Sequence, residues 1–369
     1  MMVEHSKSSR SVPSDFAQIP IVWRYELLKY LRSKRIVAAI AIVLVIMSLI
    51  YILPPALGHP YTGTDTTVGL DVMSIGSIGW QPSMSLTVEG VAILDRAQID
   101  TGSLELFYDG APYASEGGTV WSLTSMEVSG STANVVMFME NTTGHEITAT
   151  YEWYTAADEF ESGFLSFAGM LVMICATFFG ADAIVSEFQG RTGYLVFPNP
   201  IKRTTLFLGK FAASMTSSIL LIGILYGGVA ILSLFASRGI DDDFVLSFAL
   251  AIEYLLAAMA VAYVISSVLK GSTGAIVLTF FMFLMILPIV DGMSMVAGVK
   301  VEGSLTFASG AIQYILYDPY PTDSTVEMPG MSFSSFYPDP GMAAIVMMSY
   351  AVIGLALGIL MFKRKQLVG

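Results

Sequence analysis

Long runs of apolar residues recur six times along the chain, separated by polar or turn-forming segments. A helix needs about 20 apolar residues to cross roughly 30 Å of hydrocarbon, and each run approaches that length. The pattern therefore predicts an all-α polytopic membrane protein with six transmembrane helices. The predicted spans cover residues 36–53, 164–185, 207–235, 244–269, 274–290 and 341–362.

The segment before the first span, residues 17–35, has a different pattern. Apolar residues such as Tyr25 and Leu28 recur at helical spacing, basic residues such as Arg24 occupy the other faces, and Trp23 suits a membrane interface. This pattern predicts an amphipathic helix that lies on the membrane surface and leads into the first span. It fits a helix that connects to a partner and, equally well, one that only anchors to anionic lipids.

Between the first two spans, residues 54–161 alternate apolar and polar positions and are interrupted by turn signals. This alternation predicts short strands in a β-rich inserted domain, in the form of a small sandwich. Asn141 begins an Asn-Thr-Thr sequon and is a possible glycosylation site. The second long connection, residues 291–340, contains an apolar stretch at 307–316 that is long enough for a short re-entrant helix.

Composition supports the membrane class, since 54% of the residues are hydrophobic, only 13% are charged and the mean hydropathy is +0.67. Cys175 is the single cysteine, which excludes an intramolecular disulfide and a cysteine-based metal cluster. We expect no metal site. The first span could be a signal peptide cleaved near Ala56-Leu57-Gly58, but its length and the long segment before it favour an uncleaved anchor.

The basic residues are distributed unevenly between the connections. If the six spans alternate in direction, fifteen of the eighteen Lys and Arg residues fall on one side and most acidic residues on the other. The positive-inside rule then places both termini in the cytoplasm of a cell-membrane protein. The predicted order is a disordered tail (1–16), the amphipathic helix (17–35), an extracytoplasmic β-rich domain (54–161), a cytoplasmic loop (186–206), an extracytoplasmic loop (291–340) and a basic tail (363–369), arranged around the spans.

The cytoplasmic loop at 186–206 is the most informative connection. Glu187 marks the end of one span, the Pro-Asn-Pro sequence at 198–200 forbids a continuous helix, and basic residues begin the next span. A short apolar stretch is thus held at the membrane surface between charges, which is typical of an element that docks a cytoplasmic partner. The residues predicted to take part in coupling are Glu187, Gly190, Thr192, Pro198, Pro200, Arg203 and Lys210.

The order of these features resembles the ABC-2 type membrane domain of ABC transporters. The resemblance covers the whole chain except the β-rich domain. In that family the loop has an acidic residue, Gly-Thr, an apolar run, Pro, a basic residue and Lys. The matching positions here are Glu187, Gly190 with Thr192, residues 195–197, Pro198 or Pro200, Arg203 and Lys210, and Arg191 separates the Gly and Thr that often adjoin.

The resemblance implies a permease subunit that catalyses nothing itself and pairs with a second copy or a paralogue. Each subunit would rest on a nucleotide-binding ATPase that carries ATP and Mg²⁺. No phosphate-binding G-x-x-x-x-G-K-[ST] motif occurs in this chain, so the ATPase is expected to be a separate polypeptide. The segment 21–34 would be the connecting helix and 187–203 the coupling segment. Export of an apolar or amphipathic substrate is expected, and no nucleic-acid partner.

Two acidic residues fall within predicted spans. An intramembrane carboxylate is costly and is by default a functional candidate. Asp182 could pair with Lys202, Arg203 or Lys210 near the cytoplasmic end of span two. Glu253 could line the transport path, or span four could begin late and leave this residue near the outer surface close to Arg238.

Two other functions remain open from the sequence. An intramembrane aspartyl protease needs two facing acids, and Asp182 with Asp318 would be the pair, although Asp318 falls in the outer loop. A membrane receptor or sensor with an extracytoplasmic β domain is the stronger alternative. It would need a cytoplasmic output module, and the 35 residues before the first span are short for one.

Overall fold

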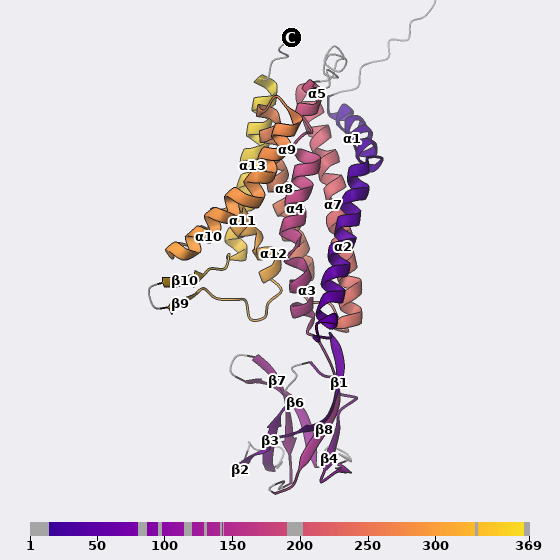
Figure 1. The fold of residues 1–369 in the computed structure, drawn as a ribbon, viewed down its shortest axis with the longest axis vertical. Helices are drawn as coiled ribbons and strands as arrows, with labels where there is room; N and C mark the ends of the chain where they lie inside the picture. The colour runs from indigo at the N-terminus through magenta and orange to yellow at the C-terminus, as the bar shows by residue number, and fades with distance from the viewer. Residues whose placement is uncertain are drawn as a thin grey trace, which may run out of the picture. The chain divides into compact units, whose positions relative to one another are not determined.

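The computed structural model divides the chain into two compact units, each drawn in Figure 1. The membrane unit comprises residues 1–49, 162–229 and 242–369, and the β unit comprises residues 50–161 and 230–241. The structure describes residues 15–79, 87–94, 98–113, 120–128, 131–140, 142, 144–189, 202–328 and 331–364.

Six helices or helical segments in the described residues are long and apolar enough to cross a membrane, as the sequence predicts. The second and fifth of these segments each contain a five-residue π-helical turn, η1 (Ala176–Gly180) and η2 (Met282–Ile286). The spans are α2 (Lys34–Ala56), the segment Ala157–Glu187 with α3 (Ala157–Leu165), α4 (Ala168–Cys175) and the start of α5 (Val185–Gln189), α7 (Arg203–Ala236), α8 (Phe244–Val268), the segment Ser272–Ala297 with α9 (Ser272–Phe281) and α10 (Leu287–Ala297), and α13 (Pro340–Arg364).

Two of the helical segments extend well beyond the spans predicted from the sequence. The segment that contains the predicted second span (164–185) begins at Ala157, because the polar residues of α3 continue into the apolar run as one helical segment. The segment that contains the predicted fifth span (274–290) continues to Ala297, because Pro288 lies in the first turn of α10, where a proline does not break a helix. The membrane boundaries of both spans stay predictions.

The centre of the membrane unit is α8, which packs against α13 and α4 (Figure 1). The backbones of α8 and α13 approach closely at Gly354. A Cβ atom placed on Gly354 would lie 2.9 Å from the Cβ of Ala260 and 3.2 Å from its carbonyl carbon. Small residues therefore set the distance between these two helices, as is common in membrane proteins.

The amphipathic helix predicted at 17–35 is observed as α1 (Asp15–Leu31), followed by a turn and then by α2. Its apolar side faces away from the protein, with Tyr25 71% exposed and Leu28 42% exposed. The side that packs on the membrane unit carries Gln18, Glu26 and Tyr30, which recur in steps of four or eight residues. The orientation suits a helix whose apolar face meets lipid and whose polar face meets protein.

In the described part of the β unit, the strands form two four-stranded antiparallel sheets with strand orders β1-β8-β4-β5 and β2-β3-β7-β6. Both sheets contribute to one apolar cluster that includes Leu106, Phe138 and Tyr151. Such pairing is typical of a sandwich. The strands are β1 (Thr62–Gly69), β2 (Met73–Gly79), β3 (Thr87–Ile93), β4 (Glu105–Tyr108), β5 (Ala111–Pro112), β6 (Trp121–Val128), β7 (Ser131–Phe138) and β8 (Ile147–Tyr154).

The connection at 291–340 contains two short helices and a hairpin in the described residues. The stretch expected to form a re-entrant helix is helical in α11 (Leu305–Ser309) and α12 (Ala311–Tyr314), which pack against α8. Ser247 Oγ of α8 lies 2.6 Å from the carbonyl oxygen of Ile312. Entry of this segment into the bilayer stays a prediction. The hairpin is formed by β9 (Ser324–Met328) and β10 (Met331–Ser335).

Acid is expected to destabilise the β unit. A hydrogen bond from Arg238 holds the pKa of Asp100 below its usual value, and one from His145 does the same to the pKa of Asp109. A lowered pKa in the folded state stabilises the fold above the unfolded pKa, ~3.9 for Asp, and this stabilisation is lost as the pH falls through the folded value. Thermal unfolding of the full chain, followed by tryptophan fluorescence at several pH values between about 5 and 3, measures the effect.

The variant Arg238→Gln removes the hydrogen bonds to Asp100 and Glu152 and should therefore flatten the acid dependence. An unfolding temperature that falls equally in the wild type and in this variant would show that Arg238 plays no part.

Candidate functional site

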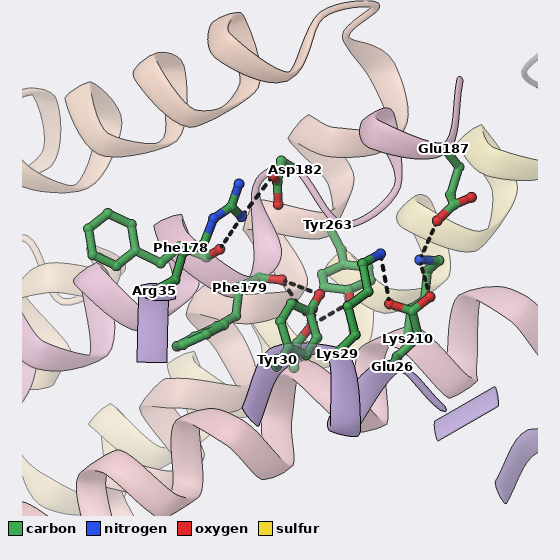
Figure 2. A network of polar contacts seen from close by, with 11 residues as sticks. Glu26, Lys29, Tyr30, Arg35, Phe178, Phe179, Asp182, Glu187, Lys210 and Tyr263 are labelled. Carbon is green, nitrogen blue, oxygen red and sulfur yellow. Dashed lines mark hydrogen bonds and ion pairs between the residues drawn. The ribbon is translucent and has the colours of Figure 1, made fainter. Parts of the chain in front are cut away.

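A buried ion-pair cluster joins three helices at the end of the membrane unit where α1 packs. Lys210 Nζ of α7 lies 2.7 Å from Glu26 Oε1 of α1 and 2.8 Å from Glu187 Oε1 of α5 (Figure 2). The side chain of Lys210 is 1% exposed, and those of Glu26 and Glu187 are 6% and 12% exposed. Glu26 also accepts a hydrogen bond from Lys29 at 3.3 Å. We call Glu26, Glu187 and Lys210 the lysine cluster.

The geometry of the lysine cluster follows from three local features. Glu26 lies on the face of α1 that packs on the protein, Lys210 lies two turns into α7, and Glu187 is in the first turn of α5. Removing Lys210 would leave the carboxylates of Glu26 and Glu187 buried without the ammonium group that both contact, which is strongly unfavourable. The lysine cluster therefore fixes α1, α5 and α7 relative to one another.

A second set of polar contacts surrounds the π-helical turn η1. Ser214 Oγ lies 2.9 Å from the carbonyl oxygen of Phe179, 3.2 Å from Tyr30 Oη and 2.8 Å from Tyr263 Oη. Tyr30 donates a hydrogen bond to the same carbonyl at 3.2 Å (Figure 2). Burial raises the pKa of Tyr30 to about 12, so its hydroxyl stays protonated and able to donate.

Asp182 pairs with Arg35, at the start of α2. Arg35 Nη1 lies 2.9 Å from Asp182 Oδ2 and 3.3 Å from the carbonyl oxygen of Phe178 (Figure 2). The sequence proposed a basic partner for Asp182 among Lys202, Arg203 and Lys210. The partner is Arg35 instead, because the turn between α1 and α2 brings the start of the first span against the end of the second.

Hydrogen bonds to neighbouring helices hold the described residues on either side of positions 190–201. On the near side, the backbone N–H groups of Ile184 and Val185 donate to Ser266 Oγ of α8 at 3.0 and 3.2 Å. On the far side, Arg203 Nη1 donates to the carbonyl oxygen of Lys363, at the end of α13, at 3.0 Å. Four residues predicted for coupling and the sequon asparagine lie outside the described residues: Gly190, Thr192, Pro198, Pro200 and Asn141.

All four residues predicted for the connecting helix line one open, mainly apolar groove of about 540 Å³ on α1: Trp23, Arg24, Tyr25 and Leu28. Trp23 Nε1 also donates to Thr216 Oγ1 of α7 at 3.0 Å and so helps to attach α1.

Glu253 lies within α8 and is half-buried. The helix α8 begins at Phe244, so Glu253 lies in its third turn. The alternative in which span four enters the membrane late stays a prediction, because the start of a helix does not give the membrane boundary. Arg238 forms ion pairs with Asp100 and Glu152 of the β unit. A place for Glu253 on the transport path stays a prediction.

Three residues of this unit were missed by sequence reasoning. Glu26 and Arg35 seemed to be ordinary charges of a basic amphipathic segment, although Gln18, Glu26 and Tyr30 form a regular polar row. Asp291 was assigned to the outer loop, but it lies in α10 and is buried; its Oδ2 accepts from Thr306 Oγ1 at 2.5 Å. Among the described residues, no group of three or more His, Cys, Asp or Glu side chains is placed to hold a metal ion.

The comparisons with known proteins agree with the arrangement of spans. The family model described as ABC-2 family transporter protein matches residues 20–367, from α1 to beyond the last helix. A search of curated proteins gave no match. Because the family model covers nearly the whole chain, this protein belongs to the ABC-2 family of transporter proteins.

Proposed function

We propose that this chain is the permease subunit of an ABC transporter that couples ATP hydrolysis on a separate nucleotide-binding subunit to movement of its own helices. Family membership supports the permease role. The observation that carries the coupling role is the lysine cluster. Lys210 pairs with Glu26 and with Glu187, and Glu187 lies just before the segment 190–201. A partner that binds this segment acts on α5 first.

The contacts of Glu187 and Arg203 indicate how a movement of the segment 190–201 would pass to the helices. Glu187, which precedes the segment, is linked to α7 by its contact with Lys210 and to α1 by the contact of Lys210 with Glu26. Arg203, which follows the segment, donates an exposed hydrogen bond to the end of α13. A push on the segment would therefore reach three helices besides α5. Buried, hydrogen-bonded ion pairs suit this role because they resist separation more strongly than exposed pairs.

The remaining parts of the proposal come from the family. ATP and Mg²⁺ would bind the partner ATPase, and the permease would pair with a second copy or a paralogue. The substrate would be apolar or amphipathic and its movement would be export. The chain would lie in the cell membrane with both termini in the cytoplasm, as its charge distribution predicts.

The variant Glu187→Gln tests the coupling role. The tagged full chain is purified in mild detergent from its native membrane together with its ATPase and returned to lipid vesicles. We expect the variant to retain the ATPase, but the ATP hydrolysis rate of the complex should fall on the order of tenfold, the factor that ~1.4 kcal/mol represents. The reason is that Gln keeps the shape of Glu187 but loses the charge that holds Lys210.

Lys300→Gln is the matched control, because it also removes one member of an ion pair, with Asp323, in a connection predicted to be extracytoplasmic. This control should hydrolyse ATP at the wild-type rate. If no ATPase accompanies the wild-type chain even after crosslinking, the permease assignment fails. If the ATPase is present and Glu187→Gln behaves like the control, only the role of the lysine cluster fails.

A further inference from the structure

A cavity with several charged side chains in its wall lies beside the lysine cluster, at the junction between α1 and α2. Its volume is about 210 Å³, far more than the ~10–15 Å³ that one water molecule requires on the same measure. The turn between the two helices forms part of its wall, and the end of the second span forms another part. The residues that line it include Lys29, Tyr30, Ser33, Arg35, Asp182 and Lys210.

The side chains of the cavity wall carry more N–H donors than the hydrogen bonds described for them use. Arg35 carries five N–H groups, and its contacts with Asp182 and Phe178 both involve Nη1. Lys29 Nζ has three donors and contacts Glu26 Oε2 at the long distance of 3.3 Å. The side chains of Arg35 and Lys29 are 49% and 55% exposed, so these donors are accessible from solution.

The acidic groups nearby are already engaged. Asp182 pairs with Arg35, while Glu26 and Glu187 both direct an oxygen at Lys210 Nζ. A cation entering the cavity would meet the ammonium and guanidinium groups. An oxyanion that only accepts hydrogen bonds would satisfy the unused N–H groups, and arginine is well suited to a phosphate.

We propose that this cavity binds a phosphate group, and that the source is the headgroup of an anionic phospholipid. The surfaces on either side favour a lipid over free phosphate. Tyr25 of α1 is 71% exposed and Val37, in the first turn of α2, is 65% exposed, so the two helices that meet at the cavity also carry exposed apolar side chains. The acyl chains can cover this surface while the phosphate occupies the donor-rich wall. The binding does not depend on ATP coupling.

The test uses the delipidated full chain in detergent and native mass spectrometry with three probes: phosphatidylglycerol, phosphatidylcholine and inorganic phosphate. We expect phosphatidylglycerol to bind best. The variants Lys29→Gln and Arg35→Gln should each weaken it roughly fivefold, the factor expected for losing one partly exposed charge contact. Lys29→Gln is the safer variant, since Lys29 makes only the long contact with Glu26 and its loss does not leave Asp182 unpaired.

Arg32→Gln is the matched control. Arg32 is exposed, carries the same charge and lies in the same turn, but it does not line the cavity. An equal loss of binding in Arg32→Gln and Lys29→Gln would overturn the site, because general surface charge would then explain the binding. Equal binding of both lipids, or unchanged binding in Lys29→Gln and Arg35→Gln, would overturn it too. Inorganic phosphate that binds as tightly as phosphatidylglycerol and is lost in the same variants would keep the phosphate site and overturn the lipid source.

Discussion

Replacing Lys210 with Met is expected to destabilise the membrane unit by about 3–5 kcal/mol, the range for breaking a buried ion pair from one side. Met retains most of the volume of the lysine side chain, so the effect comes from the charges and not from a cavity. Glu26 and Glu187, whose side chains are only 6% and 12% exposed, would lose the ammonium group that both contact. Thermal unfolding of the purified chain in detergent measures the change as a lower unfolding temperature.

Two further variants separate this explanation from a general effect of losing a lysine. Lys300→Met removes a pair whose partner, Asp323, is 41% exposed, and should change stability by no more than about 1 kcal/mol. Adding Glu26→Gln and Glu187→Gln to Lys210→Met should restore much of the lost stability, because no buried charge of the lysine cluster is then left unpaired. If Lys210→Met unfolds at the wild-type temperature, the ion pairs of the lysine cluster do not stabilise the membrane unit.

Replacing Gly354 with Leu is expected to force α13 away from α8, at a loss of stability of about 3 kcal/mol, the upper part of the range for overpacking. A Cβ atom at this position would already lie 3.2 Å from the carbonyl carbon of Ala260. Backbone atoms of a buried helix cannot rotate aside as a flexible side chain can. Thermal unfolding in detergent again provides the measurement, and a lower yield of folded protein should accompany it.

Gly223→Leu is the control for this experiment. Gly223 also lies in a span helix, α7, but a Cβ atom placed on it would have no atom of a neighbouring element within 4 Å. Leu should therefore be tolerated there and should even stabilise the helix by up to ~1 kcal/mol through its better helix propensity. Equal stability of the two variants would show that the approach of α8 and α13 is not limited by Gly354.

The spans could be predicted from the sequence because length and hydropathy alone determine which segments can cross a bilayer. Span ends were harder to predict. The predicted fifth span ends at 290, but the helix continues to Ala297, with Pro288 accommodated in the first turn of α10 after the π-helical turn η2. A π-helical turn depends on how a helix packs against its neighbours and has no clear sequence pattern, so neither η1 nor η2 was expected.

The candidate site was only partly predictable for a related reason. Glu187, Arg203 and Lys210 were identified because they border a distinctive loop. Their partners come from distant parts of the chain: Lys210 contacts Glu26 across 184 positions, and Asp182 contacts Arg35 across 147. Which carboxylate meets which base depends on the packing of α1 against the spans, and that is a tertiary property that local periodicity does not encode.

The two backbone carbonyls that accept hydrogen bonds near η1 have a practical consequence for mutagenesis. Arg35 and Tyr30 donate hydrogen bonds to the carbonyl oxygens of Phe178 and Phe179, and the rings of Tyr30 and Phe179 also pack edge to face with their centroids 5.4 Å apart. Alanine scanning of the second span would leave both carbonyl acceptors in place, so a loss of stability at Phe179 would report its buried ring and not the hydrogen bonds. The hydrogen-bonded part of the attachment is encoded in the path of the main chain, and substitutions of Arg35 and Tyr30 are needed to reveal it.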